Sequence, residues 1–383
     1  MPLATQLMAA LLLGSCNNSQ IIDGSNAEID SITFIINPNN VSNISFFDHF
    51  SEIELIPLET TPESIIEVFD KVVYHEGTFY ILDLKQATLF LFSEKGEFID
   101  KIARKGSGPG EYQDLSDFNI NEFTGNLELL DPWRKLLIFS PALEYIESID
   151  IDQRIVHQFF NINKDTIVFY ALSEDQKLSF FSRSQNNIFR KAFTYDKLEY
   201  LNLFPGAGFN IVFQRYNGRT LFTVPYLYEV FDVTNADLEH HRKLDFGKNN
   251  FKPENLEKGK DIFYHSKYYK NLKNEVFQIR YYFETDLSVF AMYVFNARYY
   301  SLRINKNSQH CDIVDRYQEG IGAVDIYTNI EDGRFFRVMN LTPEYLDAYM
   351  NILTEEQKKL VATISPEDNP GLIRYKIREH EEN

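Results

Sequence analysis

The sequence predicts an all-β fold, a six-bladed β-propeller with four-stranded antiparallel blades. Aromatic residues form 15% of the 383 residues, and flat rings suit the half-buried surfaces of strands. Units of roughly 35–50 residues, each with about four short strands, recur along the chain, which is typical of propellers. A chain of this length can form one large β domain of this kind.

Six repeat units account for most of the chain. Residues 68–102 alternate short apolar runs with turns at Gly77 and Gly96, and residues 118–151 repeat that order around Gly125. The remaining units, of which the third to fifth match more loosely, are 159–193, 209–246, 277–317 and a sixth that begins at Gly322.

The two ends of the chain are expected to meet. An open ring of blades would leave strand edges unpaired, and proteins avoid exposed edges. A first pair of strands is expected at residues 44–47 and 52–58, which belong to no blade of their own. We therefore expect this N-terminal strand to close the last blade beside the strand at residues 371–377.

Helix signals interrupt the sixth unit. Thr342 can cap a helix with Pro343 at its first position, and Thr354 with Gln357 forms a capping box for a second short helix. These signals predict a small helical insertion near the C-terminus. A polar excursion at residues 252–274 is a second, partly helical insertion. We expect both to be surface decorations that vary function.

The N-terminal residues have the pattern of an export signal. The apolar run at residues 11–13 is followed by Gly14, Ser15 and Cys16, which resembles the lipobox of bacterial lipoproteins. We therefore expect residues 1–16 to be a lipoprotein signal peptide with lipidation at Cys16, residues 17–42 a flexible tether and residues 43–383 the propeller. Residues 1–10 contain no Lys or Arg, whereas such signals carry a positive region, so a buried N-terminal helix is the alternative.

The second cysteine has a different expected role. With Cys16 lipidated, Cys311 has no partner for an intramolecular disulfide, and we expect it to behave as a small hydrophobe in or near a strand. After the signal, no stretch is long and apolar enough to cross a bilayer.

Four further segments carry a resemblance to a known family: residues 56–61, 92–102, 106–112 and 367–370. The chain resembles the six-bladed β-propeller lipoproteins of Bacteroidetes-type bacteria, which are related in architecture to NHL-repeat propellers. The resemblance covers the chain from about residue 44 to its end. It implies an exported propeller held by a lipid anchor in the cell envelope, and it brings no catalytic residues to carry over.

The glycine-rich segment after the first unit is expected to be a crossing between blades, because Gly and Pro supply the unusual backbone angles that such a crossing needs. Its residues are Gly106, Gly108, Pro109, Gly110, Glu111 and Tyr112. The alternative is a nest of backbone N–H groups that binds an anion. The segment lacks the Lys and the spacing of a phosphate-binding P-loop.

Other candidate residues carry weaker signals. Asp83 and Asp131 occupy equivalent places after a strand, which predicts turn hydrogen bonds, with channel metal ligands as the alternative. His240 and His241 would point to opposite sides of a strand and are poor joint ligands. A possible ligand loop that could stack on sugar rings contains Phe263, Tyr264, Tyr268 and Tyr269.

Charge and motifs limit the function. A formal net charge of −18 argues against a nucleic-acid partner, and the chain has no zincin motif or nucleophile elbow. We expect a non-catalytic binding or scaffold module for a protein or glycan at the cell envelope. The anchor would be its membrane contact, at the outer membrane. No cofactor is predicted. The alternative is a hydrolase or lyase with a metal-assisted site in the central channel, whose metal ligands the sequence does not identify.

Overall fold

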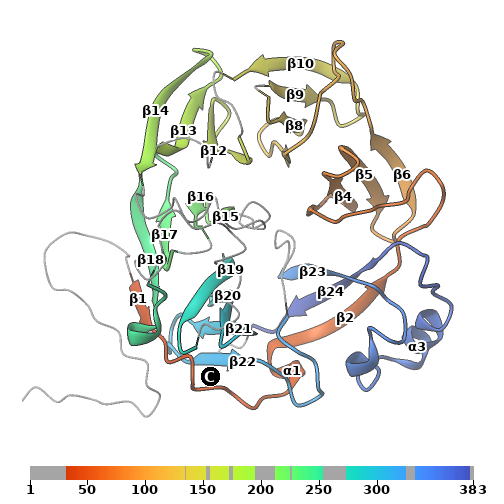
Figure 1. Cartoon of the computed structure of the whole chain (residues 1–383), viewed down its shortest axis with the longest axis vertical. Helices are drawn as coiled ribbons and strands as arrows, with labels where there is room; N and C mark the ends of the chain where they lie inside the picture. The colour runs from red at the N-terminus through yellow and green to blue at the C-terminus, as the bar shows by residue number, and fades with distance from the viewer. Residues whose placement is uncertain are drawn as a thin grey trace, which may run out of the picture.

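The computed structural model describes residues 32–133, 135–151, 156–171, 176–194, 212–224, 227–252, 273–324 and 333–379. Across these residues, six sheets stand in a ring around a central axis (Figure 1). The predicted six-bladed β-propeller is therefore confirmed. Each sheet begins near the axis and ends at the rim, and chain neighbours pair in antiparallel order.

The first three blades are complete four-stranded meanders. The first consists of β3 (Lys71–His75), β4 (Thr78–Asp83), β5 (Thr88–Ser93) and β6 (Phe98–Ile102). The second consists of β7 (Asp117–Ile120), β8 (Leu127–Asp131), β9 (Lys135–Phe139) and β10 (Tyr145–Asp150). The third consists of β11 (Gln158–Asn161), β12 (Thr166–Tyr170), β13 (Gln176–Ser182) and β14 (Asn187–Thr194).

The last three blades repeat this plan with additions from the N-terminus. The fourth consists of β15 (Phe213–Tyr216), β16 (Arg219–Phe222), β17 (Glu229–Asp232) and β18 (Glu239–Asp245). The fifth consists of β19 (Val276–Glu284), β20 (Ser288–Phe295), β21 (Arg298–Asn305) and β22 (Cys311–Val314). The described strands of the sixth are β23 (Arg334–Met339), β24 (Gly371–Ile377) and β2 (Phe50–Ile56).

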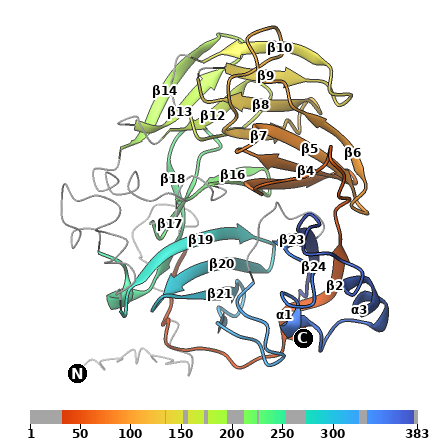
Figure 2. The same cartoon turned by 45° about the vertical axis from the view of Figure 1, so that its right-hand side comes forward.

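The N-terminal strand closes the ring as predicted. β2 pairs antiparallel with β24, with Leu55 opposite Ile373, and forms the rim of the sixth blade. Figure 2 shows the two strands side by side close to the described C-terminal end of the chain. The expected strand at residues 44–47 is wrong. Phe46–His49 is a short helix, α1, because Ser45 and Asp48 form a capping box that satisfies the first backbone N–H groups.

Part of the expected tether is a strand. β1 (Ile32–Ile35) pairs in parallel with β18 and adds a fifth strand to the fourth blade. The expectation of a flexible tether is therefore wrong for these residues, because the rim edge of β18 offers hydrogen-bonding groups that β1 satisfies. Residues 17–31 lie outside the described residues.

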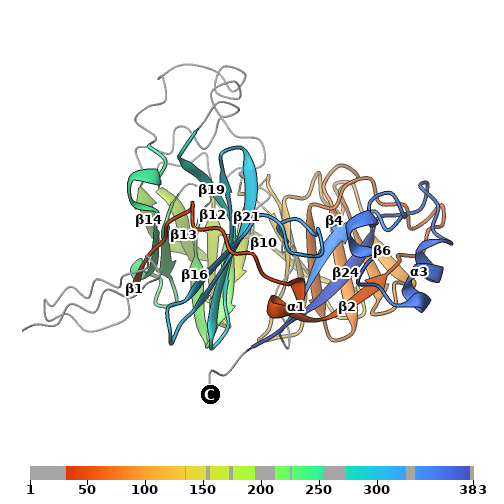
Figure 3. The same cartoon turned by 90° about the horizontal axis from the view of Figure 1, so that it is seen from below.

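The segment from residue 32 to residue 56, here called the N-terminal belt, crosses the rims of three blades. It leaves β18 of the fourth blade, and Ser42 N then donates to Ile313 O on β22 of the fifth blade at 2.7 Å. It ends as β2 in the sixth blade. Figure 3 shows its path from β1 to α1 across the fifth blade. The N-terminal belt therefore connects the fourth, fifth and sixth blades, in addition to the pairing of β2 with β24 that closes the ring.

Hydrophobic clusters lie between neighbouring blades. One of them joins the first and sixth blades, where the rings of Phe79 and Phe336 meet edge to face at 4.8 Å. Cys311 is buried in the cluster between the fourth and fifth blades, as expected for a small hydrophobe. The interleaved aromatic rings hold the blades in fixed positions around the axis.

The insertion in the sixth blade contains the expected helical turns. The capping box at Thr354 and Gln357 begins helix α3 (Glu355–Val361), as predicted. After Pro343 the chain forms turns and a 3-10 helix, η4 (Asp347–Tyr349), rather than an α-helix. In the other expected insertion, residues 253–272 lie outside the described residues.

Candidate ligand-binding site in the central channel

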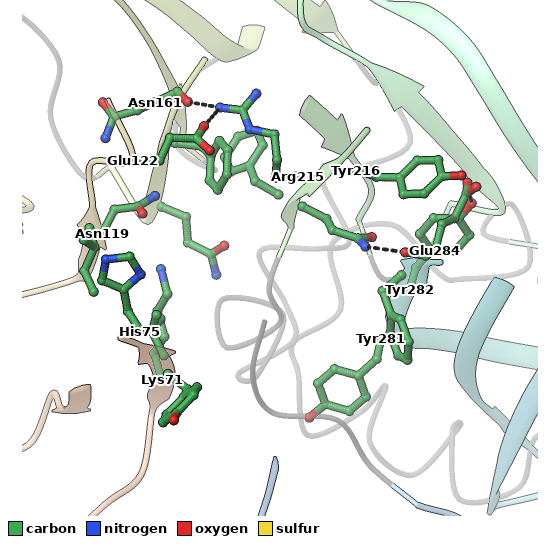
Figure 4. A pocket seen from close by; sticks show the side chains of 18 of the residues that line it. Lys71, His75, Asn119, Glu122, Asn161, Arg215, Tyr216, Tyr281, Tyr282 and Glu284 are labelled. Atoms are coloured by element: carbon green, nitrogen blue, oxygen red, sulfur yellow. Dashed lines mark hydrogen bonds and ion pairs between the residues drawn. The ribbon is translucent and has the colours of Figure 1, made fainter. Parts of the chain in front are cut away.

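The innermost strands of five blades line a cavity at the centre of the ring (Figure 4). These strands are β3, β7, β11, β15 and β19, and the cavity has a volume of about 610 Å³. Glu122, Asn217 and Asp286, which follow three of these strands, also line it. The cavity therefore opens on the face that carries the innermost hairpin turns. Its volume lies within the range of about 300–1,000 Å³ that is typical of ligand pockets.

Glu284 is a buried carboxylate beside the cavity. Its Oε1 accepts hydrogen bonds from His241 Nε2 at 2.7 Å and from the Tyr282 hydroxyl, and Lys306 Nζ lies 2.6 Å from its Oε2. Arg242 Nε lies 3.4 Å from Oε1. Burial alone would raise the pKa of Glu284, but the hydrogen bond from His241 and the charge of Arg242 outweigh it and lower the pKa to about 2.

The partners of Glu284 join two blades. Glu284 belongs to the fifth blade and His241 to the fourth. Lys306 Nζ also donates to the Tyr216 hydroxyl of the fourth blade at 2.8 Å and lies 4.2 Å from the centre of that ring. Because the carboxylate is ionised, His241 donates from Nε2 and can accept at Nδ1, where Arg219 NH1 lies 3.5 Å away. This network fixes the wall of the cavity at the boundary between these blades.

A second ion pair joins the first three blades. Lys71 Nζ lies 2.7 Å from Asp117 Oδ1 and donates to Phe118 O at the same distance. Asp117 Oδ2 accepts from Phe159 N at 3.0 Å. Burial raises the pKa of Asp117, and the positive charge of Lys71 opposes that rise. The lysine therefore compensates a carboxylate that has almost no contact with water.

Arg215 makes the third connection. Its guanidinium forms an ion pair with Glu122 of the second blade and donates to Asn161 O of the third blade at 2.6 Å. It also lies over the ring of Phe160, 5.1 Å from the ring centre. A guanidinium can hydrogen-bond at its edge and stack at its face at the same time. Arg215 therefore holds the fourth blade against its two predecessors.

Two opposite walls of the cavity differ in chemistry. Lys71, His75 and Asn119 lie on one side, here called the polar wall (Figure 4). Tyrosine side chains from β15 and β19 lie on the other side, here called the aromatic wall. The residues of the aromatic wall are Tyr216, Tyr281 and Tyr282.

Some polar groups of the polar wall are not used by the fold. Asn119 donates one long hydrogen bond, from Nδ2 to Phe159 O at 3.5 Å. Within the described ranges, its Oδ1 accepts no hydrogen bond and the ring of His75 makes none. Both side chains are half-buried and line the cavity. They are therefore available to donate to or accept from a ligand.

We searched the described residues for side chains that could bind a metal ion. Among them, no group of three or more His, Cys, Asp and Glu side chains is placed to hold a metal ion. Of the described carboxylates at the cavity, Glu284 and Glu122 contact cationic side chains, and Asp286 accepts a hydrogen bond from Asn217 Nδ2 at 3.1 Å.

The profile of a protein family, a domain of unknown function named DUF4934, matches residues 31–376. The chain belongs to the DUF4934 family. The match includes the N-terminal belt and all six blades. Together with the ring of six sheets, it supports the predicted membership in a Bacteroidetes-type family of six-bladed propellers. No curated protein matches the chain.

Two solved structures share the fold of this DUF4934 chain. A protein of Bacteroides fragilis described as a candidate exported protein has a TM-score of 0.70 at 15% identity, covering 88% of this chain and 98% of that one. A member of the DUF4221 family from Bacteroides vulgatus has a TM-score of 0.51 at 8% identity, covering 86% of this chain and 97% of that one. At such identities the likeness shows the fold alone. No helix in the described part of the chain has the length and apolar character needed to cross a membrane.

The glycine-rich segment of this DUF4934 chain lies between β6 and β7, where the first blade leads to the second. Gly108 N donates to Glu111 Oε2 at 2.7 Å, and a Cβ on Gly106 would lie 2.1 Å from that same oxygen. The Tyr112 hydroxyl donates to Ala87 O at 2.8 Å. The carboxylate of Glu111 thus occupies the place that an anion would take in a nest of N–H groups.

The repeated aspartates accept hydrogen bonds in turns, as expected: Gln86 N donates to Asp83 Oδ1 at 3.0 Å, and Trp133 N donates to Asp131 Oδ1 at 2.9 Å. Asp83 Oδ2 accepts from Glu67 N at 2.7 Å and from Val68 N at 3.1 Å. Asp131 Oδ2 accepts from Gln113 N at 2.9 Å. Each carboxylate therefore ties a strand end to the crossing that enters its own blade.

Two further predictions concern the histidine pair and the aromatic loop. His240 is exposed and His241 is buried, and a β-bulge in the pairing of β17 with β18 falls at His241. The sequence did not indicate the contact of His241 with Glu284. Cys16 and the possible ligand loop with Phe263, Tyr264, Tyr268 and Tyr269 lie outside the described residues.

Most residues of the cavity were not predicted, although the sequence contains a partial signal. The first strands of five units supply most of the residues that line the cavity. In β3, Lys71 and His75 line the cavity together with Val73 and Tyr74, whereas Val72 is fully buried. Polar residues in the first strand of each unit would have identified Lys71, Asn119 and Gln158.

Proposed function

We propose that this DUF4934 protein is an exported, lipid-anchored binding module that holds part of a glycan or protein in its central channel without converting it. The cavity carries this proposal. It is formed by several blades, its walls are fixed by ion pairs between blades, and Asn119 and His75 have polar groups to spare. A site of this kind binds without a large rearrangement, which favours affinity.

The chemistry next to the cavity favours binding over catalysis. A general acid or base must exchange a proton with its substrate near neutral pH. The pKa of Glu284 is held at about 2, and its carboxylate is enclosed by His241 and Lys306. Asp117 is likewise enclosed and contacts Lys71. These side chains stabilise the ring, and a metal-assisted hydrolase or lyase would need converging ligands beyond those that the described residues bring together.

The binding proposal is tested with arrays of glycans and of peptides, probed with the fluorescently labelled full chain. The Asn119→Ala variant removes a side chain of the polar wall, and Asn307→Ala removes an exposed amide from the turn between β21 and β22. We expect signals that Asn119→Ala weakens and Asn307→Ala preserves. Signals that both variants keep, or release of a cleaved product from a bound compound, would contradict the proposal.

The proposed lipid anchor and export are supported by other observations than the cavity. Cys16 follows an apolar run and small residues, and a structure with the same fold comes from a candidate exported protein. We expect the wild-type chain to incorporate radiolabelled palmitate in its native host type and to fractionate with membranes. Cys16→Ser should abolish both. Unchanged labelling of Cys16→Ser would show that the chain is not anchored at this residue.

A further inference from the structure

We infer that the channel ligand is an electrically neutral saccharide that contacts both the polar wall and the aromatic wall. This inference rests on the proposed function, because it assumes that the ligand enters the central cavity. It adds the chemical class of the ligand and the way in which the two walls divide its recognition.

Charge compensation argues for a neutral ligand. Among the described residues of the cavity lining, both the lysine and the arginine have a carboxylate partner: Lys71 lies 2.7 Å from Asp117, and Arg215 pairs with Glu122. Lys306, behind the aromatic wall, lies 2.6 Å from Glu284. An anionic ligand would have to compete with these built-in partners. Asp117 and Glu284 are buried and Glu122 lines the cavity, so an anion that displaced one of these carboxylates from its cation would leave the carboxylate uncompensated.

The surroundings of the cavity also oppose an anion. Asp286 is exposed at the mouth and accepts from Asn217 Nδ2 at 3.1 Å, which leaves its negative charge in place. The whole chain has a formal net charge of −18. An acidic glycan would therefore be repelled as it approaches, whereas a neutral glycan would not.

The two walls match the two kinds of surface on a sugar. An amide such as Asn119 and an imidazole such as His75 can each donate and accept, as neighbouring hydroxyl groups require. The C–H faces of a sugar ring are apolar and pack on aromatic side chains. Figure 4 shows Tyr281 and Tyr282 across the cavity from His75 and Asn119, so a saccharide that fills the cavity would meet both walls.

The first test is an array that contains neutral glycans and their uronic, sialylated and sulfated counterparts, together with peptides. We expect the full chain to bind neutral glycans and to bind acidic counterparts of the same linkage more weakly. Isothermal titration with the strongest neutral glycan then follows at 50 and 500 mM NaCl. We expect less than about a twofold change in Kd, because salt screens only interactions between charges.

Matched substitutions locate the site. Asn119→Asp keeps the shape of the side chain but replaces a donor with a charged acceptor. We expect it to weaken binding of the neutral glycan roughly 3- to 10-fold, the loss of about one hydrogen bond. Asn307→Asp makes the same charge change in an exposed turn outside the cavity and should leave Kd unchanged. If Asn119→Asp fails to fold, as judged by circular dichroism, His75→Ala takes its place.

The possible results separate the inference from the proposed function. Preference for acidic glycans, with a Kd that rises about tenfold or more in high salt and a loss in Asn119→Asp, would overturn neutrality but leave channel binding in place. Channel-dependent binding of peptides alone would overturn the saccharide and leave the binding module. Glycan binding that neither Asn119→Asp nor His75→Ala weakens would overturn both, and so would an absence of binding on both arrays.

Discussion

Lys71 Nζ lies 2.7 Å from Asp117 Oδ1, and this ion pair joins the innermost strands of the first and second blades. Only 2% of the Asp117 side chain is exposed, so its charge depends on the lysine for compensation. Among the described residues, the ion pairs of Arg215 with Glu122 and of Arg242 with Glu284 also lie at the cavity and connect blades. The same side chains therefore contribute to the stability of the ring and to the shape of the cavity.

We expect Lys71→Met to destabilise the fold by roughly 3 kcal/mol at neutral pH, because it leaves a buried carboxylate without a partner. Urea unfolding followed by circular dichroism measures the change. Without Lys71, the pKa of Asp117 should rise further above its unfolded value, so the deficit should shrink as the pH falls and Asp117 is protonated. Lys85→Met is the control, because Lys85 pairs with Glu67 at the surface, with 66% of its side chain exposed. A similar loss in both variants would contradict this account.

We expect Glu284 to make folding sensitive to acid. Its pKa is about 2 in the folded chain against an ordinary value of 4.5. A lowered pKa stabilises the folded state above the unfolded value, by about 3 kcal/mol here, and this contribution is lost as the pH falls from about 4.5 to about 2.

The measurement compares unfolding free energies of wild type and Glu284→Gln at pH 7 and pH 3. The variant should be less stable at pH 7, and its deficit should shrink at pH 3. Glu94→Gln changes an exposed residue in a turn and should follow the wild type at both values. A deficit that does not depend on pH would show that Glu284 acts through packing rather than charge.

We expect the α1 part of the N-terminal belt to contribute strongly to stability. Phe46 is fully buried, and its ring lies 4.7 Å from that of Phe50 and 5.4 Å from that of Tyr317. Phe46→Ala should destabilise the fold by about 3–5 kcal/mol, the usual result of emptying such a site. The neighbouring Phe47 is 38% exposed, and Phe47→Ala should cost less than about 1 kcal/mol. Equal losses in chemical denaturation would show that the belt is not packed at Phe46.

We expect Gly96 to be required by a close approach between segments. Gly96 and Gly77 both have positive φ, of 84° and 80°. A Cβ on Gly96 would lie 1.9 Å from the backbone oxygen of Pro57, whereas one on Gly77 would meet nothing within 4 Å. Gly77→Ala should cost about 1 kcal/mol for its backbone angle alone. Gly96→Ala should cost about 2 kcal/mol more, since the backbone must move. If Gly77→Ala and Gly96→Ala lowered the midpoint of urea unfolding equally, this expectation would be contradicted.

Local patterns were sufficient for much of the fold. Alternating apolar residues and glycine turns predicted the blades, and the need to cover a strand edge predicted that β2 closes the sixth blade. The capping box at Thr354 predicted α3. At Ser45 and Asp48 a similar signal competes with the apolar pair Phe46 and Phe47, which favours a strand. β1 was not predicted, because four residues form a strand there only when β18 supplies the partner edge.

The sequence by itself determined the repeated strands, their turns and the family to which the chain belongs, because these follow from residues that are close together along the chain. The tertiary structure alone decided the candidate site. Lys71 meets Asp117 because the ring brings the first strands of two blades together, and Glu284 meets His241 because the fourth and fifth blades pack against each other. Which polar groups pair and which stay open to a ligand depends on how the blades are placed around the ring, and no local pattern carries that information.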